Sequence, residues 1–296
     1  QITIIFTLFS YVLSLNYEGS WRYSLDDSDS CWKSSVSQCN RVLNIAHGGD
    51  WNKYYPYDSL PAFENAYNHS TDAIKGDFRV SLDNIGMIMH SSPIELYESL
   101  NCYGKYVELT SSDELKQCRM AYTDYTFISA TDLLTWSEGK VNVMLCIKDS
   151  NDISRAIETL IENNATHRAF LELKINTFVN MLSSPPIGYD QVYYIIEVYS
   201  SDDVTTMLSL DISIASKAFL YEFHTDDWLN YQEDIIRVQS AGYRAVGVTR
   251  DSPITATLTN HLDLFNDGFN IAYTYNLTNA VEARQIVNTN RRIFPA

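Results

Sequence analysis

From Arg41 onward, short apolar runs alternate with amphipathic segments of helical length, and this alternation limits the possible folds more than any other feature. Buried runs separated by helices are typical of parallel βα units. Eight such runs predict a closed (β/α)8 TIM barrel, and an open doubly wound sheet is the alternative. We expect the strands at 42–46, 73–80, 141–148, 168–175, 191–199, 217–223, 244–250 and 270–275.

The amphipathic segments between these runs predict the outer helices of the barrel. Gly242 and Gly268 each stand just past such a segment, where glycine commonly ends a helix. The stretch from Gln285 onward has two interpretations: it is the remnant of a final strand, or the run 244–250 already supplies one of the eight. We expect the helices near 59–69, 131–138, 152–164, 175–183, 202–210, 228–241, 254–266 and 279–290.

Residues 1–40 form an N-terminal extension to the barrel domain, which spans 41–296. Residues 2–15 are apolar but too few to span a bilayer as a helix. They fit the core of a signal peptide, although a basic segment and a good cleavage site are missing. We therefore favour a retained arm that packs on its own barrel or mediates self-association with a neighbouring subunit. Residues 16–40 are polar and aromatic and are expected at the surface.

One long irregular stretch, 91–130, interrupts the alternation and contains Cys102 and Cys118. Long loops without regular structure inside a compact domain are usually functional. Its two cysteines predict a crosslinked loop.

The cysteines and glycosylation sequons favour the secretory pathway. We predict the disulfides Cys31–Cys39 and Cys102–Cys118, each closing a local loop, with Cys146 left inside a strand. The alternative is five reduced cysteines in a cytosolic protein. Three Asn-x-Ser/Thr sequons weigh against that alternative and predict N-linked glycans on a secreted, extracellular chain without a transmembrane anchor. The sequons begin at Asn68, Asn164 and Asn276.

The charge balance excludes one class of partner. The chain has 21 Lys and Arg against 37 Asp and Glu, which gives a formal net charge of −16. Such a surface repels nucleic acid and anionic membranes, and no cluster of Lys or Arg offsets it. We therefore expect no nucleic-acid partner.

Two histidines occupy matching positions, each at the end of an apolar run. His47 precedes a glycine pair, and His90 precedes Ser91-Ser92-Pro93. In a parallel barrel, side chains at the carboxyl ends of strands share one face, which carries the active site. A single histidine is usually a structural group, whereas this matched pair suggests an acid and a base that face one cleft.

These segments carry a family resemblance. The order His47-Gly48-Gly49, Pro56-Tyr57-Asp58-Ser59-Leu60-Pro61-Ala62-Phe63, Lys75-Gly76-Asp77, Met89-His90 and Cys146-Ile147-Lys148 resembles that of glycerophosphodiester phosphodiesterases. It is also similar to their relatives in the PLC-like phosphodiesterase superfamily, the spider-venom sphingomyelinase D group. In that family the order reads roughly His-Arg-Gly, Pro-Glu-Asn-Thr-Leu-x-Ala-Phe, Glu-x-Asp-Val, His-Asp and Glu-Ile-Lys. A lobe after the second histidine covers the barrel mouth in the family, so the resemblance implies this role for the stretch 91–130.

The resemblance implies a site in which two histidines act on a phosphodiester beside a divalent cation held by three carboxylates. His47 and His90 match the histidines, and Asp77 matches the central carboxylate. Lys148 and Tyr273 match positions that contact the substrate. The departures from the family pattern include Gly48 for arginine, Tyr57 for glutamate, Lys75 for glutamate, Ser91 for aspartate and Cys146 for glutamate.

These departures remove the charge that a metal needs. Hard dications such as Mg²⁺ and Ca²⁺ prefer oxygen ligands and are repelled by an ammonium group, whereas Lys75, Asp77 and the thiol of Cys146 sum to about zero charge. Lys75 and Asp77 lie two residues apart on one strand and point to the same side, so they can pair where the metal would lie. We therefore expect no cofactor, with Mg²⁺ or Ca²⁺ only if activity survives.

Three alternatives remain open. Glu172, or Glu197 and Glu222 on later strands, could supply an oxygen and rebuild a metal site with Asp77. Lys75 could itself neutralise the charge of a phosphate. A soft site formed by Cys146 with Asp77 and a histidine could take Zn²⁺.

The sequence as a whole predicts a secreted glycoprotein whose barrel has lost metal-dependent catalysis. It would serve as a binding or structural building block of an extracellular assembly. The alternative is an active phosphodiesterase or phospholipase D-type enzyme that uses His47 and His90. One form of the first interpretation is a phosphate-binding module in which Lys75, Lys148 and the histidines hold an anion.

Overall fold

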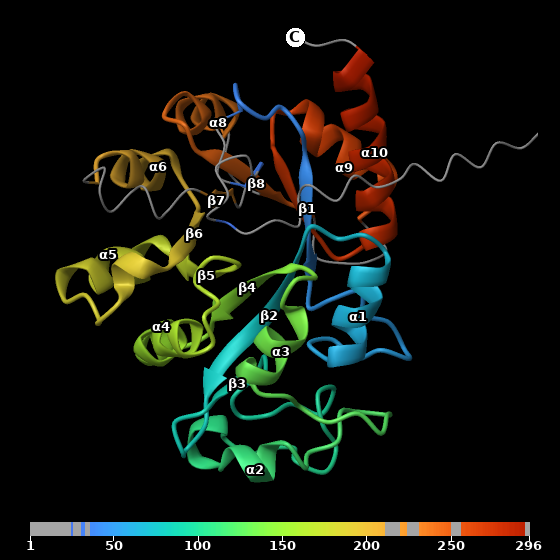
Figure 1. Ribbon diagram of the computed structural model, residues 1–296, viewed down its shortest axis with the longest axis vertical. Helices are drawn as coiled ribbons and strands as arrows, with labels where there is room; N and C mark the ends of the chain where they lie inside the picture. Colours follow the sequence, from blue (N-terminus) through green and yellow to red (C-terminus); the bar gives the residue numbers. More distant parts are fainter. Residues whose placement is uncertain are drawn as a thin grey trace, which may run out of the picture.

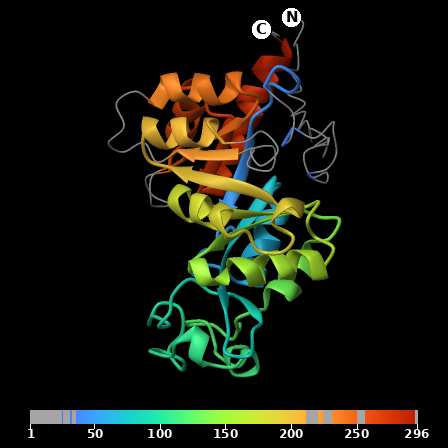
Figure 2. The same cartoon turned by 90° about the vertical axis from the view of Figure 1, so that its left-hand side faces the viewer.

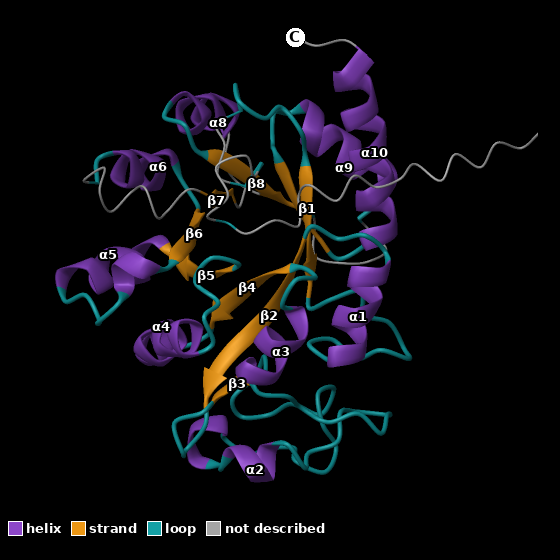
Figure 3. Ribbon diagram, in the orientation of Figure 1, coloured by secondary structure: helices purple, strands orange, loops and turns teal. Residues whose placement is uncertain are grey.

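Eight parallel strands close into a barrel in the computed structural model, which describes Leu25 and residues 31–32, 36–210, 220–223, 231–249 and 256–293. Closure follows from the pairing of β1 (Leu43–His47) with both β2 (Ala73–Val80) and β9 (Ile271–Thr274). Helices surround the strands (Figure 3). The predicted (β/α)8 barrel is confirmed, and the open doubly wound sheet is excluded.

The other barrel strands follow one another in sequence order around the barrel. They are β4 (Asn142–Ile147), β5 (Ala169–Lys174), β6 (Tyr193–Val198), β7 (Leu220–Phe223) and β8 (Arg244–Val248). Because β8 pairs with β7 and β9, the run 244–250 supplies one of the eight strands. The stretch from Gln285 onward belongs to helix α10 (Leu277–Ile293), so it is not the remnant of a strand.

The helices lie where the sequence predicts them, within a few residues at each end. Their starts follow local capping: the Ser59 hydroxyl accepts from the backbone N–H of Ala62, and Ser129 and Asp132 form a capping box. The longer helices are α1 (Leu60–Asn68), α3 (Ala130–Ser137), α4 (Ile153–Glu162), α5 (Ile175–Ser183), α6 (Ser201–Leu208), α8 (Tyr231–Ser240), α9 (Leu258–Asn266) and α10.

A segment from the N-terminal extension plugs the amino end of the barrel. Leu25 and Trp32 are fully buried and pack on residues that begin strands, among them Leu43 and Ala73. The expectation that 16–40 lies at the surface is therefore wrong for Leu25, Cys31 and Trp32, whereas residues 36–40 are exposed or partly exposed. The physical reason is that the open amino end of the barrel is apolar and must be covered. The predicted disulfide Cys31–Cys39 is present beside Trp32.

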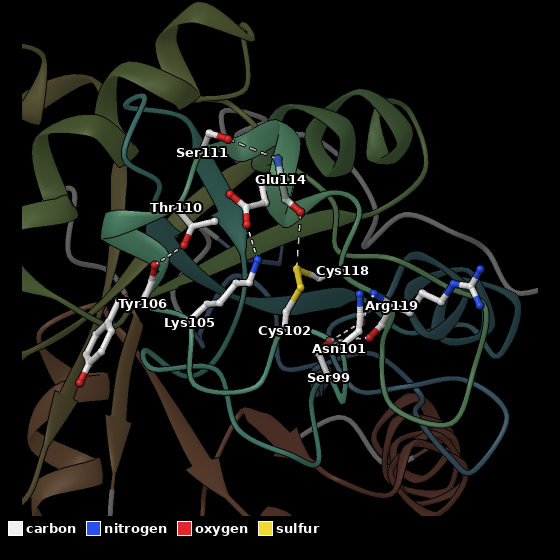
Figure 4. The surroundings of a disulfide bond; sticks show 10 residues. All are labelled: Ser99, Asn101, Cys102, Lys105, Tyr106, Thr110, Ser111, Glu114, Cys118 and Arg119. Atoms are coloured by element: carbon white, nitrogen blue, oxygen red, sulfur yellow. Dashed lines mark hydrogen bonds and ion pairs between the residues drawn. A yellow bond between two sulfur atoms is a disulfide. The ribbon is translucent and has the colours of Figure 1, made fainter.

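A lobe with its own small core, residues 81–129, stands at the carboxyl end of β2 (Figures 1 and 2). It begins with β3 (Gly86–Ile88), which pairs antiparallel with β2, so the apolar run before His90 is not a barrel strand. The lobe also contains the one-turn helices η2 (Val107–Leu109) and α2 (Ser112–Leu115). The predicted disulfide Cys102–Cys118 crosslinks it, next to the ion pair of Lys105 with Glu114 (Figure 4).

The predicted apolar arm, residues 2–15, lies outside the described residues. None of the helices in the described part of the chain is both long and apolar enough to cross a membrane.

Candidate functional site

The candidate site lies at the carboxyl ends of β1, β2 and β4, where the strand register brings the motif residues together. His47 lies opposite Lys75, and Asp77 lies opposite Cys146. Side chains alternate along a strand, so Lys75, Asp77 and Arg79 share one face of β2. Lys75 and Asp77 are 2 % and 0 % exposed, whereas Arg79 is only partly buried. This row of side chains therefore runs from the barrel interior out to the rim.

Asp77 is surrounded by donors. Its Oδ1 forms ion pairs with Lys75 Nζ and, at 2.9 Å, with Lys148 Nζ. Its Oδ2 accepts from the Tyr57 hydroxyl at 2.8 Å. Burial would raise the pKa of Asp77, but the two ammonium groups hold it well below its usual range. Asp77 is therefore ionised, and both of its oxygens are engaged by protein groups.

Lys75 is held as a cation by the same contacts. Its ammonium contacts Asp77, donates to His47 Nε2 at 2.8 Å and donates to the Tyr57 hydroxyl at 3.2 Å. Burial would lower the pKa of Lys75, but the carboxylate of Asp77 raises it well above its usual value. An ammonium group has three donors, so these three contacts account for all of them.

His47 is packed into this network. Burial first, and then the Lys75 ammonium, hold its pKa well below the usual value, so the imidazole is neutral. Its Nε2 faces the Lys75 ammonium and lies 3.0 Å from the Tyr57 hydroxyl. The rings of Tyr273 and Tyr275 contact the imidazole, with centroids 4.7 and 4.1 Å away. The lone pair that would attack or deprotonate a substrate therefore accepts a hydrogen bond from Lys75.

Tyr57 and Gly48 are packed against each other. Gly48 has φ +65°, and a Cβ placed there would lie 2.1 Å from the Tyr57 ring. Any larger residue at position 48 would collide with this ring. The two departures from the family pattern are thus adjacent in space, and an arginine at 48 is incompatible with the position of the Tyr57 ring.

His90 lies nearer the lobe. Its Nδ1 is 3.0 Å from both the Ser91 and Tyr97 hydroxyls, and its carbonyl accepts from Arg79 Nε at 2.9 Å. Burial is the largest cause that lowers its pKa. The Tyr57 ring packs edge-on against both histidines, with centroids 5.4 Å from His47 and 6.0 Å from His90. The two predicted histidines therefore share one site.

A cleft of about 920 Å³ opens between the barrel rim and the lobe. Arg79 and Lys148 line its barrel side, and His90, Leu96 and Tyr103 are among the lobe residues that line it. Arg79 and Tyr97 were not singled out from the sequence. The strand alternation with Lys75 and Asp77 points to Arg79, whereas nothing in the sequence points to the contact of Tyr97 with His90.

The residues around Asp77 do not fit a hard dication. Two ammonium groups and a phenol hydroxyl occupy its oxygens, and donors of this kind repel or exclude Mg²⁺ and Ca²⁺. Glu172 is grouped with Cys146 and Glu197 rather than with Asp77. The ligand atoms of those three side chains, which come from β4, β5 and β6, lie within 4.8 Å of one another. Cys146 is a buried free thiol, and burial first, then Glu172, raise its pKa well above the usual value.

The three sequons differ in their surroundings. Asn68 is exposed at the end of α1, and Asn164 has φ +47° in the turn after α4. Asn276 follows β9 at the carboxyl end of the barrel, and its Oδ1 accepts from the backbone N–H of Asn279. Glycan occupancy at these positions stays a prediction.

Solved structures of one enzyme family share this fold. No family model and no curated protein matches the sequence. A glycerophosphoryl diester phosphodiesterase from Parabacteroides distasonis aligns with TM-score 0.68 and 17 % identity over 86 % of this chain and 93 % of that one. A glycerophosphodiester phosphodiesterase from Agrobacterium tumefaciens aligns with TM-score 0.64 and 13 % identity over 81 % and 99 %. A phosphodiesterase from Oleispira antarctica, in complex with the product sn-glycerol-3-phosphate, aligns with TM-score 0.63 and 16 % identity over 83 % and 98 %.

Proposed function

We propose that this chain, which has the fold of the glycerophosphodiester phosphodiesterases, binds a phosphate-bearing anion without a metal and without hydrolysing it. It would do so as a secreted glycoprotein, used as a binding or structural unit of an extracellular assembly. The observation that carries the proposal is the ammonium of Lys75, which contacts both Asp77 and Nε2 of His47.

This one group removes two requirements of the family chemistry. It neutralises the carboxylate at the centre of the implied metal site, and it occupies the nitrogen that would act as base or nucleophile. A protonated lysine, with its pKa raised by Asp77, has no lone pair with which to replace that base. Neither the metal nor the first histidine is then available for hydrolysis.

The charges at the rim favour anion binding. Asp77 carries one negative charge between two lysines, and Arg79 adds a further cation where the cleft opens. Among these four groups the cations outnumber the carboxylate, which favours an anion here although the net charge of the chain is −16. Lys148 lines the cleft and is 21 % exposed, which lets a ligand reach it.

The extracellular part of the proposal rests on separate observations. The two disulfides are typical of chains that fold in an oxidising compartment. N-linked glycans are proposed at the sequons of Asn68, Asn164 and Asn276. Self-association is proposed through the apolar residues 2–15. Mass spectrometry of the native protein would test occupancy and the mature N-terminus together.

Hydrolysis assays test the catalytic part. We expect no turnover of glycerophosphocholine or lysophosphatidylcholine with Mg²⁺, Ca²⁺, Zn²⁺ or chelator, but binding of sn-glycerol 3-phosphate in calorimetry. Binding should weaken at least tenfold in Lys148→Gln. The double variant Lys75→Glu, Cys146→Glu places carboxylates beside Asp77 and should gain Mg²⁺ or Ca²⁺ binding that the native protein lacks.

An active phosphodiesterase is the second candidate, because His47 and His90 share one site through Tyr57. Turnover that disappears in His47→Ala would support it and overturn the proposal. Loss of that turnover with chelator would identify a rebuilt metal site. Persistence with chelator would identify Lys75 as the group that neutralises the phosphate.

A further inference from the structure

We propose that the cleft between the barrel rim and the lobe takes a single-chain amphiphile with a terminal anionic head, such as an alkyl phosphate monoester or a fatty acid. The head would lie on Arg79 and Lys148, and the alkyl chain would lie along Leu96 and Tyr103 of the lobe. This inference deepens the proposed function and rests on it, because it names the ligand class for the same anion site.

The head position follows from Arg79. Its Nε holds the His90 carbonyl, which fixes the guanidinium at the rim. Within the described residues, no carboxylate forms an ion pair with Arg79. A guanidinium fork matches the paired oxygens of a phosphate or carboxylate. A terminal group presents such oxygens on one side, whereas a diester places substituents on two of them.

Several acidic groups lie near the head position. Glu95 lies on the lobe wall. The carboxylate of Glu98 turns away, because it accepts from the backbone N–H groups of Ser91 and Glu95, each at 3.0 Å. Asp77 is covered by lysines.

Two further carboxyl groups lie close by. Burial raises the pKa of Asp152 to about 6 against the opposing charge of Arg79, and Glu108 accepts from the Ser92 hydroxyl on the lobe wall. A bound anion would therefore compete with Asp152 for the Arg79 guanidinium.

The tail position follows from exposed apolar side chains. Nine of the fifteen exposed large hydrophobic side chains in the described residues belong to the lobe, between Leu82 and Tyr125. Leu96 and Tyr103 are 53 % and 60 % exposed, and both line the cleft that holds the cations. Exposed apolar surface next to a charged site is typical of a ligand groove. An alkyl chain would cover this surface and gain free energy with each methylene buried.

The lobe holds this wall in place before any ligand arrives. The backbone N–H of Gly104 donates to Ile94 at 2.9 Å, and that of Ile94 donates to Lys105 at 2.8 Å. The disulfide Cys102–Cys118 anchors the same turn (Figure 4). The backbone that carries Tyr103 is therefore held in place, which limits the conformational entropy lost on binding. The cleft volume of about 920 Å³ lies within the roughly 300–1,000 Å³ typical of ligand sites.

Calorimetry with the full chain tests the proposal, using dodecyl phosphate below its critical micelle concentration, butyl phosphate and inorganic phosphate, all with chelator. We expect dodecyl phosphate to bind at least about 100-fold more tightly than inorganic phosphate. Arg79→Gln should weaken every anion at least tenfold. The double variant Leu96→Ser, Tyr103→Ser should bring dodecyl phosphate close to butyl phosphate and leave inorganic phosphate unchanged.

The matched control is Tyr122→Ser. Tyr122 is 86 % exposed on the same lobe but lines a different hollow, so its variant should bind dodecyl phosphate like the native protein. Equal affinity for dodecyl and inorganic phosphate would overturn the proposed position of the alkyl chain. The same conclusion would follow if Tyr122→Ser lost as much affinity for dodecyl phosphate as the variant Leu96→Ser, Tyr103→Ser. If a neutral dodecyl glycoside bound as tightly as dodecyl phosphate, the proposed anionic head position at Arg79 and Lys148 would be overturned. Binding to anionic vesicles but not to monomeric dodecyl phosphate would overturn the cleft in favour of a membrane surface.

The probes also separate this inference from the proposed function. A phosphate monoester has no diester bond to cleave, so its binding is measured whether or not the protein hydrolyses glycerophosphocholine. If the protein hydrolyses glycerophosphocholine and also binds dodecyl phosphate, the amphiphile cleft stands and the non-hydrolytic function fails. If there is no turnover and the affinity for phosphates does not depend on chain length, the non-hydrolytic function stands and the amphiphile cleft fails.

Discussion

Lys148 belongs both to the buried network around Asp77 and to the cleft beside the lobe. The charged groups of these two regions differ in how far they are already in contact with other protein groups. Around Asp77 both carboxylate oxygens contact protein groups, and the donors of Lys75 are all used. At the rim, Arg79 uses only Nε among its donors within the described residues, and apolar side chains are exposed beside it. Charges paired inside a protein contribute to its structure, whereas exposed cations beside an apolar wall are available to a ligand. On the proposed function, a ligand therefore binds at the rim rather than at Asp77.

Removing Lys75 should give the largest effect. Lys75→Met leaves the buried Asp77 with one lysine fewer, and breaking a buried pair typically lowers the free energy of unfolding by about 3–5 kcal/mol. Urea denaturation measures it. The control is Lys116→Met, whose pair with Asp132 is half exposed and should contribute at most about 1 kcal/mol. Equal losses in both variants would mean that Lys148 alone satisfies Asp77.

Breaking the lobe crosslink should have a slightly smaller effect, confined to the lobe. The pair Cys102→Ser, Cys118→Ser opens a loop with a sequence separation of 16, for which chain entropy gives about 3 kcal/mol. Hydrogen exchange should increase at lobe amides and stay unchanged in β1 and β9. Opening Cys31–Cys39 should instead loosen the plug at the amino end of the barrel. Identical exchange patterns in the two variants would contradict this division.

The coupling of Gly48 to Tyr57 comes next. Gly48→Ala introduces a Cβ in contact with the Tyr57 ring and should destabilise by about 1–3 kcal/mol. Adding Tyr57→Ala removes the collision, so the double variant should be more stable than the sum of the single changes by at least about 0.5 kcal/mol. Thermal or urea unfolding of the cycle measures this coupling. Strict additivity would show that backbone strain at φ +65° alone causes the loss.

The smallest effect is a change in pH dependence. Burial lowers the pKa of His47, so below about pH 6.5 the unfolded state binds a proton that the native state does not. Its contribution to stability is present above that pH and is lost as the pH falls. His47→Asn should reduce the slope of unfolding free energy between pH 6 and 5 by up to about 1.4 kcal/mol per pH unit. An unchanged slope would mean that His47 is protonated in the native state.

Several features of the site followed from local rules in the sequence. The positions of Lys75 and Asp77 on one side of β2 follow from the two-residue period of a strand. The disulfide Cys102–Cys118 follows from two cysteines in one irregular stretch. The contact between the Tyr97 hydroxyl and His90 has no such basis, because it depends on how the lobe folds back over the rim.

The amino-acid sequence alone determined the barrel, the order of its strands and helices, both disulfides and the presence of Lys75 and Cys146 where the family it resembles has carboxylates. These are matters of periodicity, spacing and residue type, which act over a few neighbouring positions. Only the tertiary structure decided that Tyr57 fills the space above Gly48, that Trp32 plugs the amino end and that Glu172 groups with Cys146 rather than Asp77. Such contacts join distant segments, and packing in three dimensions selects among the many pairings that local rules permit.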